Sequence, residues 1–295
     1  MPRSFKSRFN GWLLRKTIDT AVRRTGELPI AVSSHIGLIR KENQDRIAVV
    51  RFSDPAGIPY ILVTVCDGMG GMVDGAACAA AALSTFVSSF IEESVKIHTE
   101  QKLHNAVLAA NNAIFQAYQG KGGSTLSALL FEGTKKIYSV NIGDSRIYQF
   151  EKNKLFQLTI DDTLAGQMSR DPSSYSGRNE LLQFVGVGTM VEPHISKELL
   201  PESDTVFMIS SDGLHFLPID TMQRILENAS EPAIAAKRLT DVAMWCGGHD
   251  NASVAILIPQ IIFGLSKQLL DSDTIEIWDP FGEVQLIKYL QPSNR

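Results

Sequence analysis

Four aspartates stand beside short apolar runs of the chain, and each is joined to a glycine or an asparagine that allows a sharp turn: Asp67, Asp144, Asp212 and Asp250. Runs of this length, rich in Val and Ile, predict strands buried in a sheet, with the carboxylates at strand ends. If those ends lie together, the carboxylates repel one another unless cations are bound. Oxygen ligands without Cys and with little His favour Mg²⁺ or Mn²⁺ over zinc.

A turn without metal is the alternative at each of these positions. Asp-Gly between apolar residues is also a common signal for a β-hairpin, and any one such site alone is more often a turn than a ligand. Asp67 argues against that interpretation, because Gly-Met-Gly-Gly and a long Ala-rich segment follow it where a hairpin needs a second strand. The alternative stays open for Asp144, since Gly-Asp-Ser also forms an ordinary turn between strands.

The elements that must position these carboxylates follow from apolar periodicity. Helices are predicted at residues 74–93, 100–118, 218–227 and 232–245. Four strands are predicted at residues 125–131, 136–140, 146–150 and 154–158, and together they are expected to form one meander. Strands grouped between helix pairs, without strict alternation, favour an α+β fold with antiparallel sheets and helices on their outer faces.

Composition limits the classes of function. The 295 residues are 44% hydrophobic, which is enough for a sizeable core, and the net charge of −4 argues against a nucleic-acid binder. The three cysteines share no metal-ligand spacing and fit a reducing cytosol. Since no segment has the apolar length of a membrane span or the form of a signal peptide, we expect a cytoplasmic protein.

The two ends of the chain are predicted to be extensions of a central domain at residues 29–260. Residues 1–28 are basic and amphipathic, which favours a solvated helix packed weakly on the domain, with weak contact to an anionic membrane as the alternative. Residues 261–295 contain two strand patterns joined at Asp279-Pro280-Phe281-Gly282, and this hairpin would complete a sheet edge or bind a partner.

A series of motifs resembles one known family. GLIRKENQD, VCDGMGG, GGSTLSALL, VNIGDSRIY, LTIDD, ISSDGL and HDNASVAI occur in the order and approximate spacing of the metal-dependent protein phosphatases of type 2C, the PPM family, in their bacterial form. The resemblance covers roughly residues 30–259. It implies a four-layer αββα sandwich and hydrolysis of phosphoserine and phosphothreonine in proteins, with two Mn²⁺ or Mg²⁺ ions, a possible third ion, and substrates phosphorylated by a Ser/Thr kinase.

The resemblance also implies roles for individual residues. Asp67 would bridge the two core ions, Gly68 would add its backbone carbonyl, and Asp212 and Asp250 would complete the second ion site. Asp45 would hold metal-bound water, Asp144 would hold the third ion, and Arg40 would clamp the phosphate through paired hydrogen bonds.

Three residues depart from the family pattern. Met69 stands where animal relatives carry a histidine general acid, and Asp162 and Met72 replace two other histidines. The flap at residues 162–179 is short and rich in chain-breaking residues, so it should be mobile and alter specificity. Two other functions stay open: a catalytically weak phosphoprotein-binding module, and a phosphatase for small phosphoesters. The intact aspartates and Arg40 favour catalysis.

Overall fold

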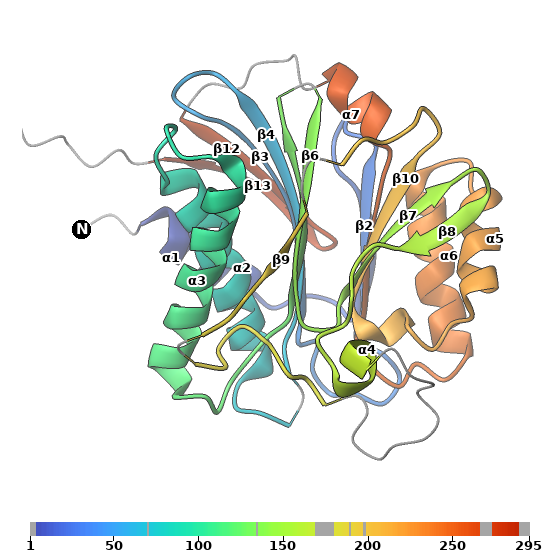
Figure 1. The fold of residues 1–295 in the computed structure, drawn as a ribbon. Coiled ribbons are helices and arrows are strands. Elements are labelled where there is room, and N and C mark those ends of the chain that lie inside the picture. Colours follow the sequence, from blue (N-terminus) through green and yellow to red (C-terminus); the bar gives the residue numbers. More distant parts are fainter. Residues whose placement is uncertain are drawn as a thin grey trace, which may run out of the picture.

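Two antiparallel sheets packed face to face form the centre of the molecule (Figure 1). The computed structural model describes residues 4–69, 71–133, 135–168, 180–188, 190–196, 199–265 and 273–288. Within these residues six strands form one sheet, in the order β1 (Thr20–Arg24), β2 (Ile30–His35), β11 (Ala252–Leu257), β10 (Val206–Ser210), β7 (Arg146–Glu151) and β8 (Lys154–Gln157). Seven strands form the other, in the order β13 (Gly282–Ile287), β12 (Thr274–Asp279), β3 (Asp45–Ser53), β4 (Pro59–Asp67), β5 (Leu126–Glu132), β6 (Lys136–Ile142) and β9 (His194–Ile195).

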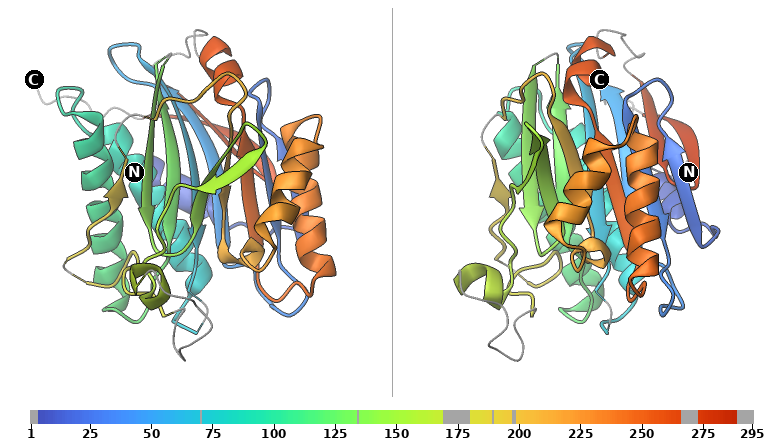
Figure 2. Two further views of the ribbon diagram at one scale, coloured as in Figure 1. Left: turned by 45° about the vertical axis from the view of Figure 1, so that its right-hand side comes forward. Right: turned by 90° about the vertical axis from the view of Figure 1, so that its right-hand side faces the viewer.

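Helices cover the outer face of each sheet, as the turned views show (Figure 2). The seven-stranded sheet carries α1 (Phe5–Leu13), α2 (Gly75–Glu92) and α3 (Thr99–Tyr118), and the six-stranded sheet carries α5 (Ile219–Glu227) and α6 (Pro232–Trp245). Shorter elements are α4 (Leu164–Met168), the 3-10 helix η2 (Asp212–Leu214) and α7 (Pro259–Leu265). The predicted α+β fold, an αββα sandwich of four layers, is confirmed.

Three apolar clusters lie between the four layers and explain the unbroken apolar runs. In β4, Leu62 and Cys66 pack toward the helices, whereas Ile61, Val63 and Val65 pack toward the other sheet. Because both faces of the strand are buried, the sequence shows a continuous apolar run and no alternation with polar residues. The run ends at Asp67, where the strand leaves the core.

The four central strands do not form one meander, so that prediction is wrong. β5 and β6 pair in the seven-stranded sheet, whereas β7 and β8 pair in the six-stranded sheet. The chain crosses between the sheets at residues 143–145, where Gly143 has a φ of +97° and a Cβ there would lie 2.7 Å from Cγ2 of Thr125. Strand periodicity cannot tell which sheet a strand joins. The crossing places Asp144 between the two sheets.

The N-terminal helix is packed firmly, contrary to the expectation of a solvated helix. Phe5, Phe9 and Leu13 of α1 are buried in the cluster beneath α2 and the seven-stranded sheet. Arg15 then forms two hydrogen bonds of 2.7 Å to the carboxylate of Asp279, at the end of β12. β12 pairs with β3, so the C-terminal strands complete the edge of this sheet.

One helix meets the length and composition of a membrane span within the described residues. This helix is α2, and 72% of it is buried inside the fold. Much of the predicted flap, residues 169–179, lies outside the described residues.

Candidate active site

A cleft of about 480 Å³ is lined by residues from both sheets. Helix α4 lies at one end of the sandwich (Figure 1). Six of the seven residues predicted for the site line the cleft, namely Arg40, Asp67, Gly68, Asp144, Asp212 and Asp250. Within the described residues, the rest of the lining is formed by Met69, Thr125, Glu180 and Leu181. The six predicted residues come from the ends of β4 and β10, the crossing after β6, the turn before β11 and the loop after β2. The predicted convergence of strand ends is therefore found in the structure.

Close backbone approach, and not hairpin formation, explains the glycine after two of the aspartates. A Cβ on Gly68 would lie 2.1 Å from the carbonyl oxygen of Gly75, at the start of α2. A Cβ on Gly213 would lie 2.0 Å from the carbonyl oxygen of Asn251. Larger residues at either position would push these segments apart, so the glycines bring the neighbouring aspartates to the cleft.

Asp67 is held in place by Thr125 at the start of β5. The hydroxyl of Thr125 accepts a hydrogen bond of 2.9 Å from the backbone N–H of Asp67 and lies 2.8 Å from the hydroxyl of Ser145. Because Ser145 follows Asp144, one small side chain links the positions of both aspartates. Thr125 lies within the GGSTLSALL motif, but nothing local in the sequence predicts this role for it.

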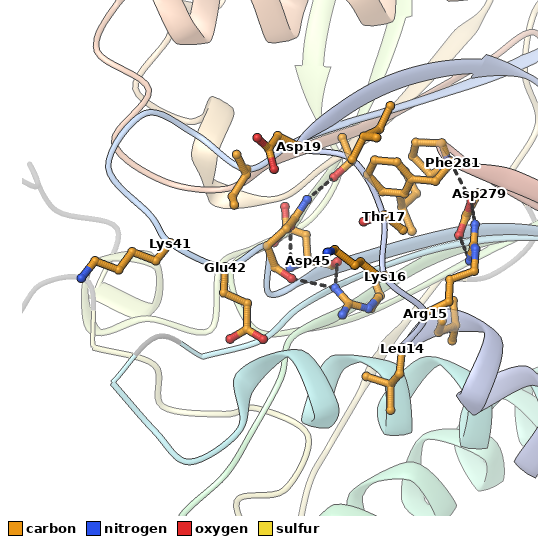
Figure 3. Close-up of a pocket in the computed structure, with 18 residues that line it drawn as sticks. Leu14, Arg15, Lys16, Thr17, Asp19, Lys41, Glu42, Asp45, Asp279 and Phe281 are labelled. Atoms are coloured by element: carbon orange, nitrogen blue, oxygen red, sulfur yellow. Dashed lines mark hydrogen bonds and ion pairs between the residues drawn. The ribbon is translucent and has the colours of Figure 1, made fainter.

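Asp45 lies behind the cleft and does not line it. It faces Asp67 across the β3–β4 pair, is 3% exposed, and accepts a hydrogen bond of 2.7 Å from the hydroxyl of Ser211. Asp45 lines a second cavity, of about 340 Å³, which the segment after α1 and the turn after β12 help to enclose (Figure 3). Its carboxylate is thus withdrawn from solvent beside the site.

The carboxylates of the site hold protons more tightly than ordinary aspartates. Burial, opposed by hydrogen bonds from Ser211 and Ser253, raises the pKa of Asp45 to about 6. Burial and then the charge of Asp212 raise the pKa of Asp144 to about 7. Burial, followed by the charges of Asp250 and Asp45, raises the pKa of Asp212 to about 7. Each shift means that a negative charge is unfavourable there without a compensating cation.

Asp67 shows the same effect most strongly. Burial raises its pKa well above the usual range, and the charges of Asp45, Asp212 and Asp144 add to the shift. Asp67 is thus the carboxylate on which the charges of several neighbouring aspartates act together.

Two buried oxygen atoms test whether a divalent cation fits. Oδ1 of Asp45 and Oδ1 of Asp212 are shielded from water and have no hydrogen-bond partner within the described residues. Buried acceptors without partners are costly, and a hard cation that accepts oxygen ligands would satisfy them. Within the described residues no three Asp, Glu, His or Cys side chains stand close enough together to hold an ion as they lie in the structure, so the carboxylates would have to draw closer around one. The donor set fits Mg²⁺ or Mn²⁺.

Arg40 contacts one of these carboxylates directly. Its Nη2 atom lies 2.5 Å from Oδ2 of Asp250, and the two side chains are 40% and 29% exposed. The bond to Asp250 raises the pKa of Arg40, and the charges of Asp250, Asp212 and Asp67 contribute further. The side chain predicted to clamp phosphate therefore reaches the cleft but is paired with a predicted metal ligand.

Comparisons with known proteins agree with this geometry. No family model matches the chain. The chain is 29% identical over 247 residues to the serine/threonine protein phosphatase PstP of Mycobacterium tuberculosis, a match that covers 79% of this chain and 45% of PstP. It is 28% identical over 244 residues to a putative protein phosphatase 2C-type of Streptococcus pyogenes, covering 78% of this chain and 97% of the relative. The chain thus spans less than half the length of PstP.

Solved structures show the same fold. The serine/threonine phosphatase of S. agalactiae superposes with a TM-score of 0.68 and 25% identity, covering 78% of this chain and 98% of the other. The catalytic domain of PstP in complex with two manganese ions superposes with a TM-score of 0.63 and 27% identity, covering 80% and 97%. By sequence and fold this chain is similar to bacterial phosphatases of the PPM family.

Two further side chains, Asn251 and Asp162, brace the candidate site, and no local signal in the sequence predicts these roles. Asn251 accepts a hydrogen bond of 2.8 Å from the backbone N–H of Gln44 and donates to the carbonyl oxygens of Ile36 and Glu42. It thereby fixes the loop that carries Arg40. The HDNAS motif contains Asn251, but from the sequence alone this asparagine is interpreted only as a turn residue.

Asp162, one of the departures from the PPM pattern, is fully buried and has a structural role. It accepts a hydrogen bond of 2.9 Å from the backbone N–H of Gly143, beside Asp144, and lies 2.8 Å from Nε2 of His194 in β9. The carboxylate therefore ties the crossing between the sheets to β9.

Proposed function

We propose that the chain is a metal-dependent protein phosphatase that hydrolyses phosphoserine and phosphothreonine esters. One observation carries the proposal: four carboxylates, those of Asp67, Asp144, Asp212 and Asp250, line one cleft together with Arg40, and a buried oxygen of Asp212 and one of Asp45 behind it have no partner within the described residues. Such a cluster is arranged to hold cations, and the nearby guanidinium is suited to a phosphate dianion. The serine/threonine phosphatase names of the relatives support the same reaction class.

In this proposal Asp67, Asp212, Asp250 and the carbonyl of Gly68 would hold two core ions. Asp45 would support the same ions from behind the cleft, and Asp144 would hold a third, weaker ion. Bound divalent ions supply a nucleophilic water at neutral pH and stabilise charge on the phosphoryl oxygens. The residues Asp67, Asp212 and Asp250 would thus fix the position of attack without forming a covalent bond to the substrate.

Arg40 would bind the phosphoryl group at the edge of the carboxylate cluster. In the structure Asp250 pairs with Arg40 and holds its guanidinium at the cleft. The guanidinium, which is 40% exposed, would donate two parallel hydrogen bonds to the phosphoryl group. Asp250 would thus orient Arg40 as well as serve as a ligand.

Substitution of Arg40 separates a phosphate-binding role from a simple surface charge. We expect Arg40→Ala to lower kcat/KM by on the order of 2–4 kcal/mol, and Arg40→Lys, which keeps charge but not paired geometry, by less. Inhibition by inorganic phosphate should weaken in parallel. Lys41→Ala, at the neighbouring exposed cation outside the cleft, should change neither quantity. If Arg40→Ala stays within twofold of wild type in both, Arg40 does not contact phosphate.

A substrate panel tests the function. With Mn²⁺ present, we expect higher kcat/KM for phosphoserine and phosphothreonine peptides than for small phosphoesters such as p-nitrophenyl phosphate, since a protein substrate adds contacts outside the cleft. A preference for the small esters would instead identify a small-molecule phosphatase. Tight binding of phosphopeptides without turnover would identify a binding module.

The natural substrates would be phosphoproteins made by a Ser/Thr kinase, and the enzyme would act in the cytoplasm.

A further inference from the structure

Three large apolar side chains are exposed on the loops next to the cleft. Leu38 and Ile39, directly before Arg40, are 63% and 67% exposed, and Phe216, just after η2, is 43% exposed. Single exposed apolar residues are ordinary on protein surfaces. A group of them beside a binding cleft is less so, because contiguous apolar surface commonly marks an interaction site. We call Leu38, Ile39 and Phe216 the apolar rim.

The turn that precedes Asp250 holds the rim together. The backbone N–H of Leu38 donates a hydrogen bond of 2.7 Å to the carbonyl of Gly248, and a Cβ on Gly248 would lie 2.8 Å from Cγ of Leu38. The ring of Phe216 lies 6.2 Å from the ring of His249, in an edge-to-face arrangement. Leu38 and Phe216 thus contact consecutive residues of one turn.

The rim borders the mouth of the cleft. The turn leads directly into Asp250, whose carboxylate pairs with Arg40, and Ile39 is the neighbour of Arg40 in the chain. When a phosphorylated residue of a protein substrate contacts Arg40, the substrate residues before and after it must lie across the mouth of the cleft. Extended chain advances about 3.3–3.6 Å per residue, so side chains up to about three residues from the phosphate lie within about 10 Å of it along the chain, and the rim residues are chain neighbours of Arg40 or contact the turn before Asp250. The substrate itself is therefore the occupant that the position of the rim favours.

We propose that the apolar rim binds a large aliphatic or aromatic side chain of the substrate, located within about three residues of the phosphorylated serine or threonine. The proposal rests on the proposed phosphatase function and adds a substrate preference to it. Leu38, Ile39 and Phe216 carry no group that acts on the phosphoester, so they would determine specificity and leave the chemistry unchanged.

Matched phosphopeptides test the rim. One peptide set carries Leu or Phe at positions one to three before or after phosphothreonine, and the reference peptide carries Ser there. Wild type should favour at least one apolar peptide by about tenfold in kcat/KM, the discrimination that burial of one apolar group commonly gives. Leu38→Ser/Ile39→Ser and, separately, Phe216→Ser should reduce this ratio to within about threefold of unity.

Two controls make the outcome decisive. Hydrolysis of p-nitrophenyl phosphate, which has no flanking chain, should stay within twofold of wild type in both rim variants. Ile287→Ser, at an exposed apolar residue of β13, should keep the full peptide preference. The inference is overturned if wild type hydrolyses p-nitrophenyl phosphate but does not discriminate among the peptides, or if rim variants lose both activities equally. If wild type hydrolyses no phosphoester, the proposed function fails and the inference fails with it.

Discussion

Asp67→Asn and Asp212→Asn should each abolish measurable phosphatase activity, with a loss of at least about 10³-fold at saturating Mn²⁺. Asparagine keeps the size of the side chain but removes the negative charge that a metal ligand supplies. The charges of Asp45, Asp212 and Asp144 act on Asp67, and Asp212 has a buried oxygen without a partner within the described residues, so both side chains belong to the cluster that would hold the ions. Initial rates over a range of Mn²⁺ concentrations measure the effect.

The same variants should remain folded, which separates loss of the site from loss of the fold. Without metal the buried carboxylates oppose folding, and removing one should leave the melting temperature in EDTA unchanged or raised. Asp220→Asn, on the exposed first turn of α5, serves as the control and should keep full activity. Near-wild-type turnover in either site variant would remove that aspartate from the proposed ligand set.

The metal-free protein should lose stability as the pH rises from about 4 to about 7. Burial raises the pKa of Asp45 to about 6 and that of Asp212 to about 7, whereas an unfolded aspartate titrates near ~3.9. For a group with a raised folded pKa, its stabilising contribution is complete below the unfolded pKa and is lost as the pH rises through the folded pKa. In this interval the folded state binds more protons, so the free energy of unfolding falls with pH.

Mn²⁺ should reverse this trend, because the ions bind only the ionised carboxylates and stabilise the folded state more as the pH rises. Urea unfolding of wild type and Asp212→Asn, each in EDTA and in Mn²⁺, measures both effects. The variant should show a shallower pH dependence in EDTA and a smaller response to Mn²⁺. Equal pH dependence of the two proteins would show that the Asp212 charge does not oppose folding.

Local signals in the sequence located most helices and strands, because both the buried runs and the 3.6-residue periodicity are short-range patterns. Helix α6 begins and ends where predicted, at Pro232 and Trp245. The crossing at residues 143–145 escaped prediction, since it depends on which sheet β7 joins. The firm packing of α1 was not predicted either. The basic residues between Phe5 and Leu13 resemble a solvated surface when their partners are unknown.

The candidate site shows the same division between local and long-range information. The aspartates were recognisable because each stands at the end of an apolar run. Thr125 and Asn251 were not, since small polar side chains are common in loops and their roles appear only when distant segments meet. The pairing of Arg40 with Asp250 joins residues 210 positions apart, and no local pattern predicts it. Asp45 was found by its motif, but its place behind the cleft follows from strand register.

Phosphate release from one phosphothreonine peptide, measured first in excess EDTA and then after saturating Mn²⁺ is added to the same sample, tests the central claim most directly. If the clustered aspartates hold catalytic ions, the metal-free protein should release no phosphate above background, and Mn²⁺ or Mg²⁺ should restore turnover. Mass spectrometry during turnover should find no phosphorylated residue on the enzyme. A full rate in EDTA, or a phosphocysteine trapped on the chain, would contradict metal-dependent hydrolysis by water.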